Sequence, residues 1–430
     1  MKVTKMKMVA LLMACVSPAS PADAEPAKTE GKQPNEALRP TGIVIHAAAA
    51  RPMITDFGYD VKQPGKAESF TAKRAKDIFV TDGFTCLRIP IWGDVNKPAH
   101  PAPGKIVEGL YKSVLNAMKL ARAAKPDVIF FASKRLEGKK SWPDWTKDAD
   151  GVIVEKYSLM LNDYLSFMHR NGFKIDLLGI DNEGEYNDGN ITPEKHKAIV
   201  AAVKSFCATN GIHMPKIIGP ETYGPKPKWF AGLYRIGGKD SLDIGGTHYY
   251  PRFRKPAHFE AWAKAAGGIP LWHTELHWDK LDAPKNVLDE AEQAMATLFD
   301  CTDNGVTGFV WWAYHRPDVK GEIESALTSS LVRASPLPVD DGNPAMKHGS
   351  LFARAFRKGN TITLWAVNNS ANPINTQLKI DGAVVSGNAA FQQWTISGSS
   401  TGILTPAADG VPIAIPARTV TMITIQIAVK

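Results

Sequence analysis

The segment IPLWHTELHW, residues 269–278, places one glutamate between two histidines at the end of an apolar run. Side chains alternate between the two faces of an extended strand, so the pattern predicts that His273, Glu275 and His277 point the same way. Histidine and carboxylate groups are common ligands of zinc. The segment therefore indicates either a metal site or a glutamate that works with a second carboxylate elsewhere.

The remaining sequence favours the second alternative. A metal-dependent hydrolase gathers several His and Asp ligands from different elements. The first predicted strand, 53–58, contains no histidine, and His46 lies outside it. His273 and His277 would also lie about 13 Å apart along an extended strand, too far to bind one ion without a bend. We expect no metal and no other cofactor.

Carboxylates also end other apolar runs. Glu183 follows IDLLGID at 175–181. Hydrolysis of a glycosidic bond uses two carboxyl groups, one that protonates the leaving oxygen and one that stays ionised and attacks the anomeric carbon. Arg88 would favour the ionised form of such a group, and the hydroxyl of Tyr250 can orient it. Glu183 and Glu275 are therefore the predicted catalytic pair.

Other polar and aromatic residues follow the same apolar runs. Aromatic planes suit the apolar faces of sugar rings, and a few polar groups fix their orientation. Glu221 or Glu185 is the alternative second carboxylate if the strand ends are displaced by two residues, and His248 has a structural alternative as a core histidine. The predicted substrate-binding residues are Arg88, Trp92, Asn182, Glu221, His248, Tyr250, Trp311 and Trp312.

A scaffold must bring these distant segments together. Eight short runs, apolar on both faces, alternate with amphipathic helices. This pattern predicts an α/β fold of the (β/α)8 TIM-barrel type. In such a barrel the functional residues lie at the C-terminal ends of the strands. A doubly wound open sheet is the alternative, and the lack of a glycine-rich phosphate turn after the first run weakens it. The eight runs are 53–58, 84–91, 127–133, 175–181, 216–220, 242–248, 269–275 and 306–312.

The pattern changes towards the C-terminus. Residues 343–358 predict a helix that closes the barrel, and the alternation that follows is typical of a small antiparallel β-sandwich. Trp365 and Trp394 in this region could form a sugar platform, but the alternation favours packing. The predicted domains are a catalytic barrel at 41–357 and a β-sandwich at 358–430. Residues 42–48 need not belong to the barrel, because they can add an edge strand to the β-domain.

The N-terminus has the layout of a secretory signal peptide, residues 1–24. Lysines precede the apolar run MVALLMACV, and Ala22-Asp23-Ala24 is a suitable cleavage site. Cleavage predicts a secreted or periplasmic protein that begins with a linker over 25–40, and lipid anchoring through Cys15 is the alternative. No later run reaches about 18 consecutive apolar residues, so no membrane span is expected.

The composition is that of a soluble globular protein. The chain has 430 residues, 44% hydrophobic and 22% charged, with a net charge of +8. This charge could favour nucleic acid or an anionic polysaccharide, but the scattered Lys and Arg favour a basic secreted monomer without a nucleic-acid partner. Cys86, Cys207 and Cys301 show no paired spacing, so we expect buried free thiols.

In combination, the motifs resemble glycoside hydrolase clan A, most closely family 30. The Asn-Glu pair in GIDNEGE resembles the clan's acid/base motif, Tyr250 in THYY resembles the strand-six His-x-Tyr, and WHTE resembles the strand-seven nucleophile. RIPIW contains the strand-two arginine, Arg88. Two segments depart from the sequences usual in family 30, namely FASKRLEGKKSWPDW and GEYNDG. These differences leave open which family of the clan the sequence resembles most and which substrate it acts on. The resemblance implies Glu275 as nucleophile and Glu183 as acid/base.

We therefore expect a secreted retaining glycoside hydrolase that cleaves a β-linked polysaccharide or oligosaccharide through a glycosyl-enzyme. Endo action is favoured because an open cleft lined with aromatic residues suits a polymer. The alternative is a catalytically silent glycan-binding lipoprotein, which hydrolysis of an aryl β-glycoside would exclude.

Overall fold

The computed structural model describes residues 42–63, 65–94, 96–184, 191–251, 254–277, 287–313, 319–340 and 351–429. The predicted signal peptide, linker and Cys15 lie outside these residues. Residues Pro40–Lys430 form one compact unit. Within the described part of the chain, no helix combines the length and the apolar composition needed to cross a membrane.

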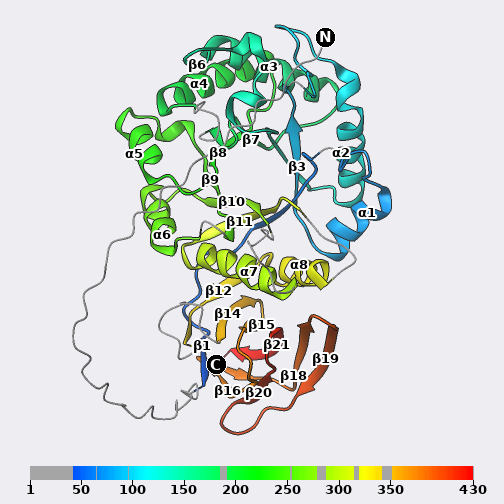
Figure 1. The fold of residues 1–430 in the computed structure, drawn as a ribbon, viewed down its shortest axis with the longest axis vertical. Coiled ribbons are helices and arrows are strands. Elements are labelled where there is room, and N and C mark those ends of the chain that lie inside the picture. Colours follow the sequence, from blue (N-terminus) through cyan, green and yellow to red (C-terminus); the bar gives the residue numbers. More distant parts are fainter. Residues whose placement is uncertain are drawn as a thin grey trace, which may run out of the picture. The chain divides into compact units, whose positions relative to one another are not determined.

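Eight parallel strands close into a barrel, which confirms the predicted fold class (Figure 1). Their order around the barrel follows the chain, and the last strand pairs with the first. Each of the eight predicted runs overlaps one of them. The barrel strands are β2 (Asp56–Asp60), β3 (Cys86–Ile91), β4 (Ile129–Lys134), β7 (Leu177–Gly179), β8 (Lys216–Thr222), β9 (Ile244–His248), β10 (Leu271–Leu276) and β11 (Val306–Trp311).

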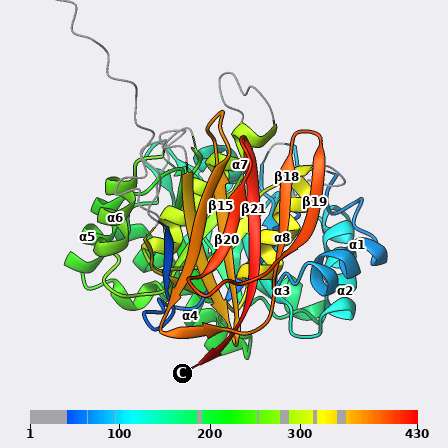
Figure 2. The ribbon, with the colours of Figure 1, turned by 90° about the horizontal axis from the view of Figure 1, so that it is seen from below.

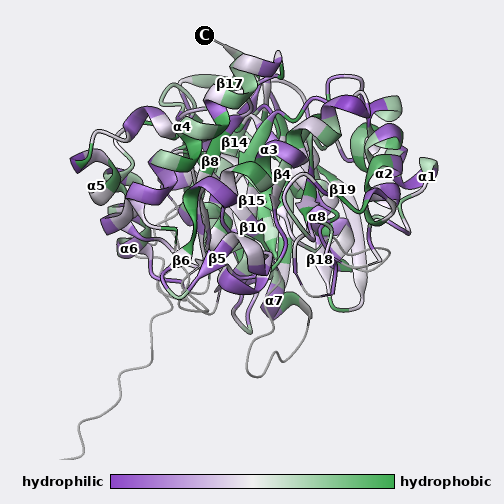
Figure 3. Ribbon diagram, turned by 90° about the horizontal axis from the view of Figure 1, so that it is seen from above, coloured by the Kyte–Doolittle hydropathy of each residue, from purple (hydrophilic) through white to green (hydrophobic). Residues whose placement is uncertain are grey.

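Helices surround the barrel, and in Figure 3 they carry hydrophilic segments around a mostly hydrophobic centre. Sequence signals fix their ends: the Thr192 side chain accepts a hydrogen bond from the Lys195 N–H at 3.3 Å, and Gly211 ends the same helix with φ 63°. The helices are α1 (Ala72–Lys76), α2 (Lys112–Ala124), α3 (Val154–Arg170), α4 (Pro193–Asn210), α5 (Pro227–Arg235), α6 (Pro256–Ala265), α7 (Val287–Asp303) and α8 (Val319–Leu331). Shorter elements are the π-helical turn Asp77–Thr81, the 3-10 turns Glu108–Tyr111, Gly138–Ser141, Asp144–Thr146 and Lys239–Ser241, and the strands β5 (Lys147–Asp148) and β6 (Gly151–Val152).

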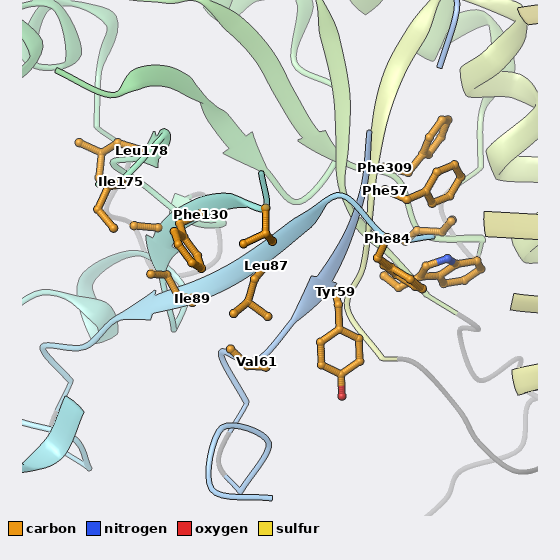
Figure 4. Packing of buried hydrophobic residues seen from close by; sticks show 14 of the residues in the cluster. Phe57, Tyr59, Val61, Phe84, Leu87, Ile89, Phe130, Ile175, Leu178 and Phe309 are labelled. Carbon is orange, nitrogen blue, oxygen red and sulfur yellow. The ribbon is translucent and has the colours of Figure 1, made fainter. Parts of the chain in front are cut away.

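Two apolar clusters hold the barrel together. The larger one lies between strands and helices, and Figure 4 shows part of it, with Phe57 and Tyr59 from β2 and Leu87 and Ile89 from β3. The smaller one consists of strand residues that alternate with these and therefore fill the barrel interior. Its buried members are Cys86, Phe131, Leu177, Ile218, Ile244, Trp272 and Val310.

The C-terminal strands form two sheets that share a separate apolar core (Figure 2). β1 (Ile43–His46) pairs with β13 and β16 in the smaller sheet, so it does add a strand to the β-domain, but inside the sheet and not at the edge that the sequence suggested. The smaller sheet also contains β13 (Val339–Asp340), β16 (Ile374–Asp381) and β20 (Val411–Ile415). The larger contains β12 (Ser335–Leu337), β14 (Leu351–Lys358), β15 (Thr361–Asn368), β17 (Ala383–Val385), β18 (Ala389–Thr395), β19 (Gly398–Leu404) and β21 (Thr419–Val429).

The predicted helix at 343–358 is wrong where the structure describes it, and its first part lies outside the described residues. Leu351–Lys358 form β14, which pairs with β15 over its whole length. Alanine, arginine and lysine favour a helix locally, but the pairing with β15 decides the conformation. Because β12, β13 and β14 belong to the two C-terminal sheets, the sheets begin before the predicted boundary at 358.

Trp365 and Trp394, on the C-terminal strands β15 and β18, belong to the large apolar cluster and pack against the barrel helix α8. Their rings are stacked at 5.5 Å, both are fully buried, and their N–H groups donate to Ser330 and Glu322 of α8. This arrangement supports the packing alternative. Cys86, Cys207 and Cys301 are buried free thiols, as predicted.

Candidate active site

Glu275, on β10, is held by hydrogen-bond donors on both oxygens. Oε1 accepts from Arg88 Nη1 at 2.6 Å and from Lys62 Nζ at 3.2 Å, and Oε2 accepts from the Tyr250 hydroxyl at 2.6 Å. Burial alone would raise the pKa of Glu275, but the positive charges of His248, Lys62 and Arg88 hold this pKa well below its ordinary value. Glu275 is therefore ionised.

Glu183 follows β7 in a turn with φ 47°, and its N–H donates to the Glu221 carbonyl at 2.9 Å. Its Oε1 lies 2.6 Å from His248 Nδ1. Burial raises the pKa of Glu183, and His248 offsets only part of this effect. The site thus has one carboxyl group that favours the proton and one that favours the negative charge, which is how environment assigns acid and base roles.

His248 connects the two carboxyl groups. Its Nδ1 lies 3.4 Å from Glu275 Oε2, and one oxygen of each glutamate lies within 4.8 Å of the other and of this nitrogen. Burial would lower the pKa of His248, but the Glu275 and Glu183 carboxylates outweigh it and raise this pKa. The short separation matches the geometry in which a carboxylate attacks a sugar directly, with no water between them.

Arg88, on β3, holds the base of the site together. Besides Glu275, its guanidinium donates to Asp60 at 3.1 Å and to Glu221 at 2.5 Å. It also donates to the Ser133 hydroxyl and to the Asn182 side-chain oxygen, which makes five acceptors in all. Its Cζ lies 5.1 Å from the Phe131 ring, so the charged layer rests on the apolar barrel interior. Arg88 and Asn182 therefore lie beside the predicted catalytic pair, Glu183 and Glu275.

Glu221 is fully buried beneath this pair. Its two oxygens accept from Arg88 Nη2 and, at 2.8 Å, from the Ser133 hydroxyl. A Cβ atom at Gly179 would overlap its carboxylate, so the glycine provides the space that this side chain fills. These contacts favour positioning of Arg88, and not sugar binding, as the role of Glu221.

Lys62, Asp60 and Ser133 were not among the predicted site residues. Asp60 is the last residue of the first barrel strand, which ends two residues later than the predicted run, and Lys62 follows this strand. The charged pair in DVK directly after an apolar run was the available signal. Ser133 has no comparable signal because small polar residues are common at strand ends.

The predicted aromatic residues are divided between the site and the core. Trp312 is half-buried and lies 4.7 Å from the His277 ring, which in turn lies 6.3 Å from Tyr250. Trp92 and Trp311, in contrast, are only 2% and 1% exposed and belong to the large apolar cluster. Of these tryptophans, Trp312 has the position to stack on a sugar.

His273 does not share a site with Glu275, so the predicted common orientation is wrong. The pairing of β10 with both neighbouring strands shifts in register between His273 and the residues after it. Such a bulge changes the direction of the following side chains. His273 is fully buried, with its ring 6.4 Å from Tyr249 and 6.3 Å from Phe309.

Glu183, His248 and Glu275 are also close enough to bind one cation. Both oxygens of Glu275 already accept hydrogen bonds, and two of the donors are cations. These positive charges oppose a metal ion at the same position, so the donor set fits a carboxylate pair better. Glu185, the alternative acid, lies outside the described residues.

No family model matches the chain, but curated proteins and solved structures are similar to it. Glucuronoxylanase XynC of Bacillus subtilis (strain 168) is 22% identical over 413 residues, which cover 86% of this chain and 87% of that protein. The solved catalytic domain of a GH30 xylanase C from Talaromyces cellulolyticus has a TM-score of 0.67 at 16% identity, covering 89% of this chain and 99% of that one. A GH30 endoxylanase from Clostridium papyrosolvens C71 has a TM-score of 0.65 at 15% identity, covering 90% of this chain and 100% of that one.

Proposed function

We propose that the chain is a secreted, retaining, endo-acting glycoside hydrolase of clan A, most like family 30. The glucuronoxylanase to which it is 22% identical and the fold that it shares with GH30 xylanases support this proposal. One observation carries the proposal: two buried carboxyl groups with opposed pKa shifts present oxygens within 4.8 Å of one another.

In the first step, Glu275 attacks the anomeric carbon and Glu183 gives its proton to the departing oxygen. The bond between that carbon and the leaving oxygen breaks, and an ester bond to Glu275 forms. Burial raises the pKa of Glu183, which favours the proton before the step, and Arg88 and Tyr250 hold the attacking carboxylate in place. Each group thus starts in the protonation state that its role requires.

In the second step, Glu183 has lost its proton and acts as a base. It takes a proton from water as the water oxygen attacks the anomeric carbon, and the ester electron pair returns to Glu275. Two inversions give a product of retained configuration. His248 lies against both carboxyl groups and can compensate the charge that moves between them.

The substrate that we propose is a β-linked xylan. The support is the activity for which the relatives are named, glucuronoxylanase and xylanase, together with the aromatic group of Tyr250, His277 and Trp312, of which Tyr250 contacts Glu275. The predicted signal peptide supports action outside the cytoplasm. The N-terminus isolated from the native host should therefore begin near Glu25, or at a lipidated Cys15.

The test combines a substrate panel with active-site labelling. We expect soluble products from xylans among β-linked plant, algal and fungal polysaccharides, and a covalent adduct on Glu275 after incubation with a 2-deoxy-2-fluoro glycosyl fluoride. Glu275→Gln is the matched control and should give neither. Binding of a polysaccharide with no turnover and no adduct would support the non-catalytic alternative.

A further inference from the structure

We infer that Lys62 is a second cation on the nucleophile, acting mainly when the glycosyl-enzyme breaks down. This role rests on the proposed function, because it concerns the same ester. Lys62 Nζ lies 3.2 Å from Glu275 Oε1, and its side chain is 1% exposed. It therefore contacts one of the reacting groups without access to bulk solvent.

The surroundings of Lys62 fix both its position and its charge. Nζ donates to the Lys134 carbonyl at 2.9 Å, to Asn182 Oδ1 at 3.1 Å and to Glu275 Oε1. Three acceptors match the three hydrogens of an ammonium group. The Lys62 backbone N–H donates to Asp60 Oδ1 at 2.6 Å, which fixes the turn after β2. The lysine is thus built into the site in its charged form.

Arg88 alone gives the nucleophile only a share of one positive charge, because its guanidinium also donates to Asp60 and Glu221. Lys62 makes an ion pair with Glu275 and with no other described carboxylate. It therefore adds a charge directed at the nucleophile. This second charge agrees with the lowered pKa of Glu275, to which Lys62 contributes.

The positions of the donors also distinguish the two oxygens of Glu275. Oε1 accepts from Lys62 and Arg88, whereas Oε2 accepts from the Tyr250 hydroxyl and lies 3.4 Å from His248 Nδ1, the nitrogen that also contacts Glu183. Oε2 is thus the oxygen on the side of the proton donor, so it attacks the sugar and Oε1 becomes the carbonyl oxygen of the ester. The ester has no formal charge, so Lys62 stabilises the free carboxylate more than the ester. It consequently favours ester breakdown, in which the bond from the anomeric carbon to Oε2 breaks and the carboxylate forms again.

The experiment compares Lys62→Met with Lys134→Met. Lys134 is also a fully buried lysine, but its Nζ contacts Met160 Sδ at 4.0 Å and none of the site's carboxylates. The substrate is the 2,4-dinitrophenyl β-glycoside of the sugar that the wild type releases. Its good leaving group makes ester formation fast, so breakdown limits turnover. Lys62→Gln is a second neutral variant in case the methionine prevents folding, which near-UV circular dichroism checks.

For Lys62→Met or Lys62→Gln we expect kcat to fall about tenfold or more, with a burst of dinitrophenol equal to the enzyme concentration. The fall in kcat/KM at the optimal pH should be smaller. The acidic limb of the kcat/KM profile should move to higher pH by about 1–3 units, the effect of an opposite charge at short range. Lys134→Met should keep the wild-type limb and the wild-type rate of steady-state dinitrophenol release.

Two results would overturn the inference. One is an unchanged acidic limb with equal losses in kcat and kcat/KM, which would show a purely structural role. The other is the same change in Lys134→Met, which would show a general effect of replacing a buried lysine. A wild type that cleaves no glycoside and forms no adduct on Glu275 would instead refute the proposed function, so the two failures are distinguishable.

Discussion

Glu221 offers a direct test of how the charged layer beneath the catalytic pair works. The change Glu221→Gln keeps the size of the side chain and one acceptor oxygen but removes its charge. One oxygen of the Glu221 carboxylate accepts a hydrogen bond from Arg88, the other accepts one from Ser133, and the residue is fully buried. We therefore expect the variant to loosen Arg88 and to leave substrate binding unchanged.

The magnitude follows from the number of partners of Arg88. Removing one partner of a buried ion pair costs about 3–5 kcal/mol. Asp60 and Glu275 still neutralise Arg88, and the amide oxygen still accepts a hydrogen bond, so we expect a loss of about 2–3 kcal/mol. For a unit of this size, that loss lowers Tm by about 2–4 °C. A freer Arg88 should lower kcat about tenfold, equivalent to about 1.4 kcal/mol.

The assay is differential scanning calorimetry together with steady-state kinetics on the cleaved polysaccharide. Glu155→Gln, at an exposed position of α3, makes the same chemical change at the surface and should alter neither Tm nor kcat. A severalfold rise in KM at unchanged Tm would refute the reasoning, because it would mean that Glu221 contacts the sugar, as the sequence suggested.

Three further predictions concern catalysis, metal and acid stability. Glu275→Ala should abolish turnover, and added azide should then give a product of inverted configuration. Glu183→Ala with azide should instead give a product of retained configuration from dinitrophenyl glycosides. NMR determines the anomeric configuration of both products, and exchanged outcomes would reverse the two roles. Dialysis against EDTA should leave the rate unchanged, and a loss that zinc restores would contradict the carboxylate mechanism. Burial lowers the pKa of His273 to about 3, so the unfolded chain binds the proton first and stability falls as pH drops below about 6.5. Near pH 5, His273→Phe should make the free energy of unfolding, measured in urea, fall less steeply with decreasing pH, by about 1.4 kcal/mol per pH unit. An unchanged pH dependence of the free energy of unfolding would mean that His273 does not titrate on unfolding.

The sequence was sufficient for the barrel because its signals are local and repeated. Apolar runs separated by amphipathic helices predict parallel strands wherever they occur, and strand ends then locate Glu183, Glu275, Arg88 and Tyr250. The end of one run was placed two residues too early, at 58 instead of Asp60. Lys62, two residues beyond the strand, was therefore not counted among the strand-end residues, although it contacts the predicted nucleophile.

Other features depend on tertiary structure and have no local signal. The bulge in β10 turns His273 away from Glu275, and strict alternation cannot reveal it. Trp311 follows an apolar run just as Trp312 does, but its N–H donates to Thr328 in the core. Residues 351–358 become a strand only because β15 provides a partner. In each case the deciding contact joins segments far apart in the sequence.

The packed interior of the barrel also determines the order of events during a reaction cycle. Trp272, for which Gly308 leaves the space, and the other interior side chains fill the barrel beneath Arg88. Water, substrate and product must therefore use the same opening, on the side of the catalytic carboxyl groups. In the proposed reaction, the part of the glycan that departs with the leaving oxygen has to diffuse away before water reaches the ester. An alcohol that enters in its place receives the sugar instead, so hydrolysis and glycosyl transfer compete for one vacated position.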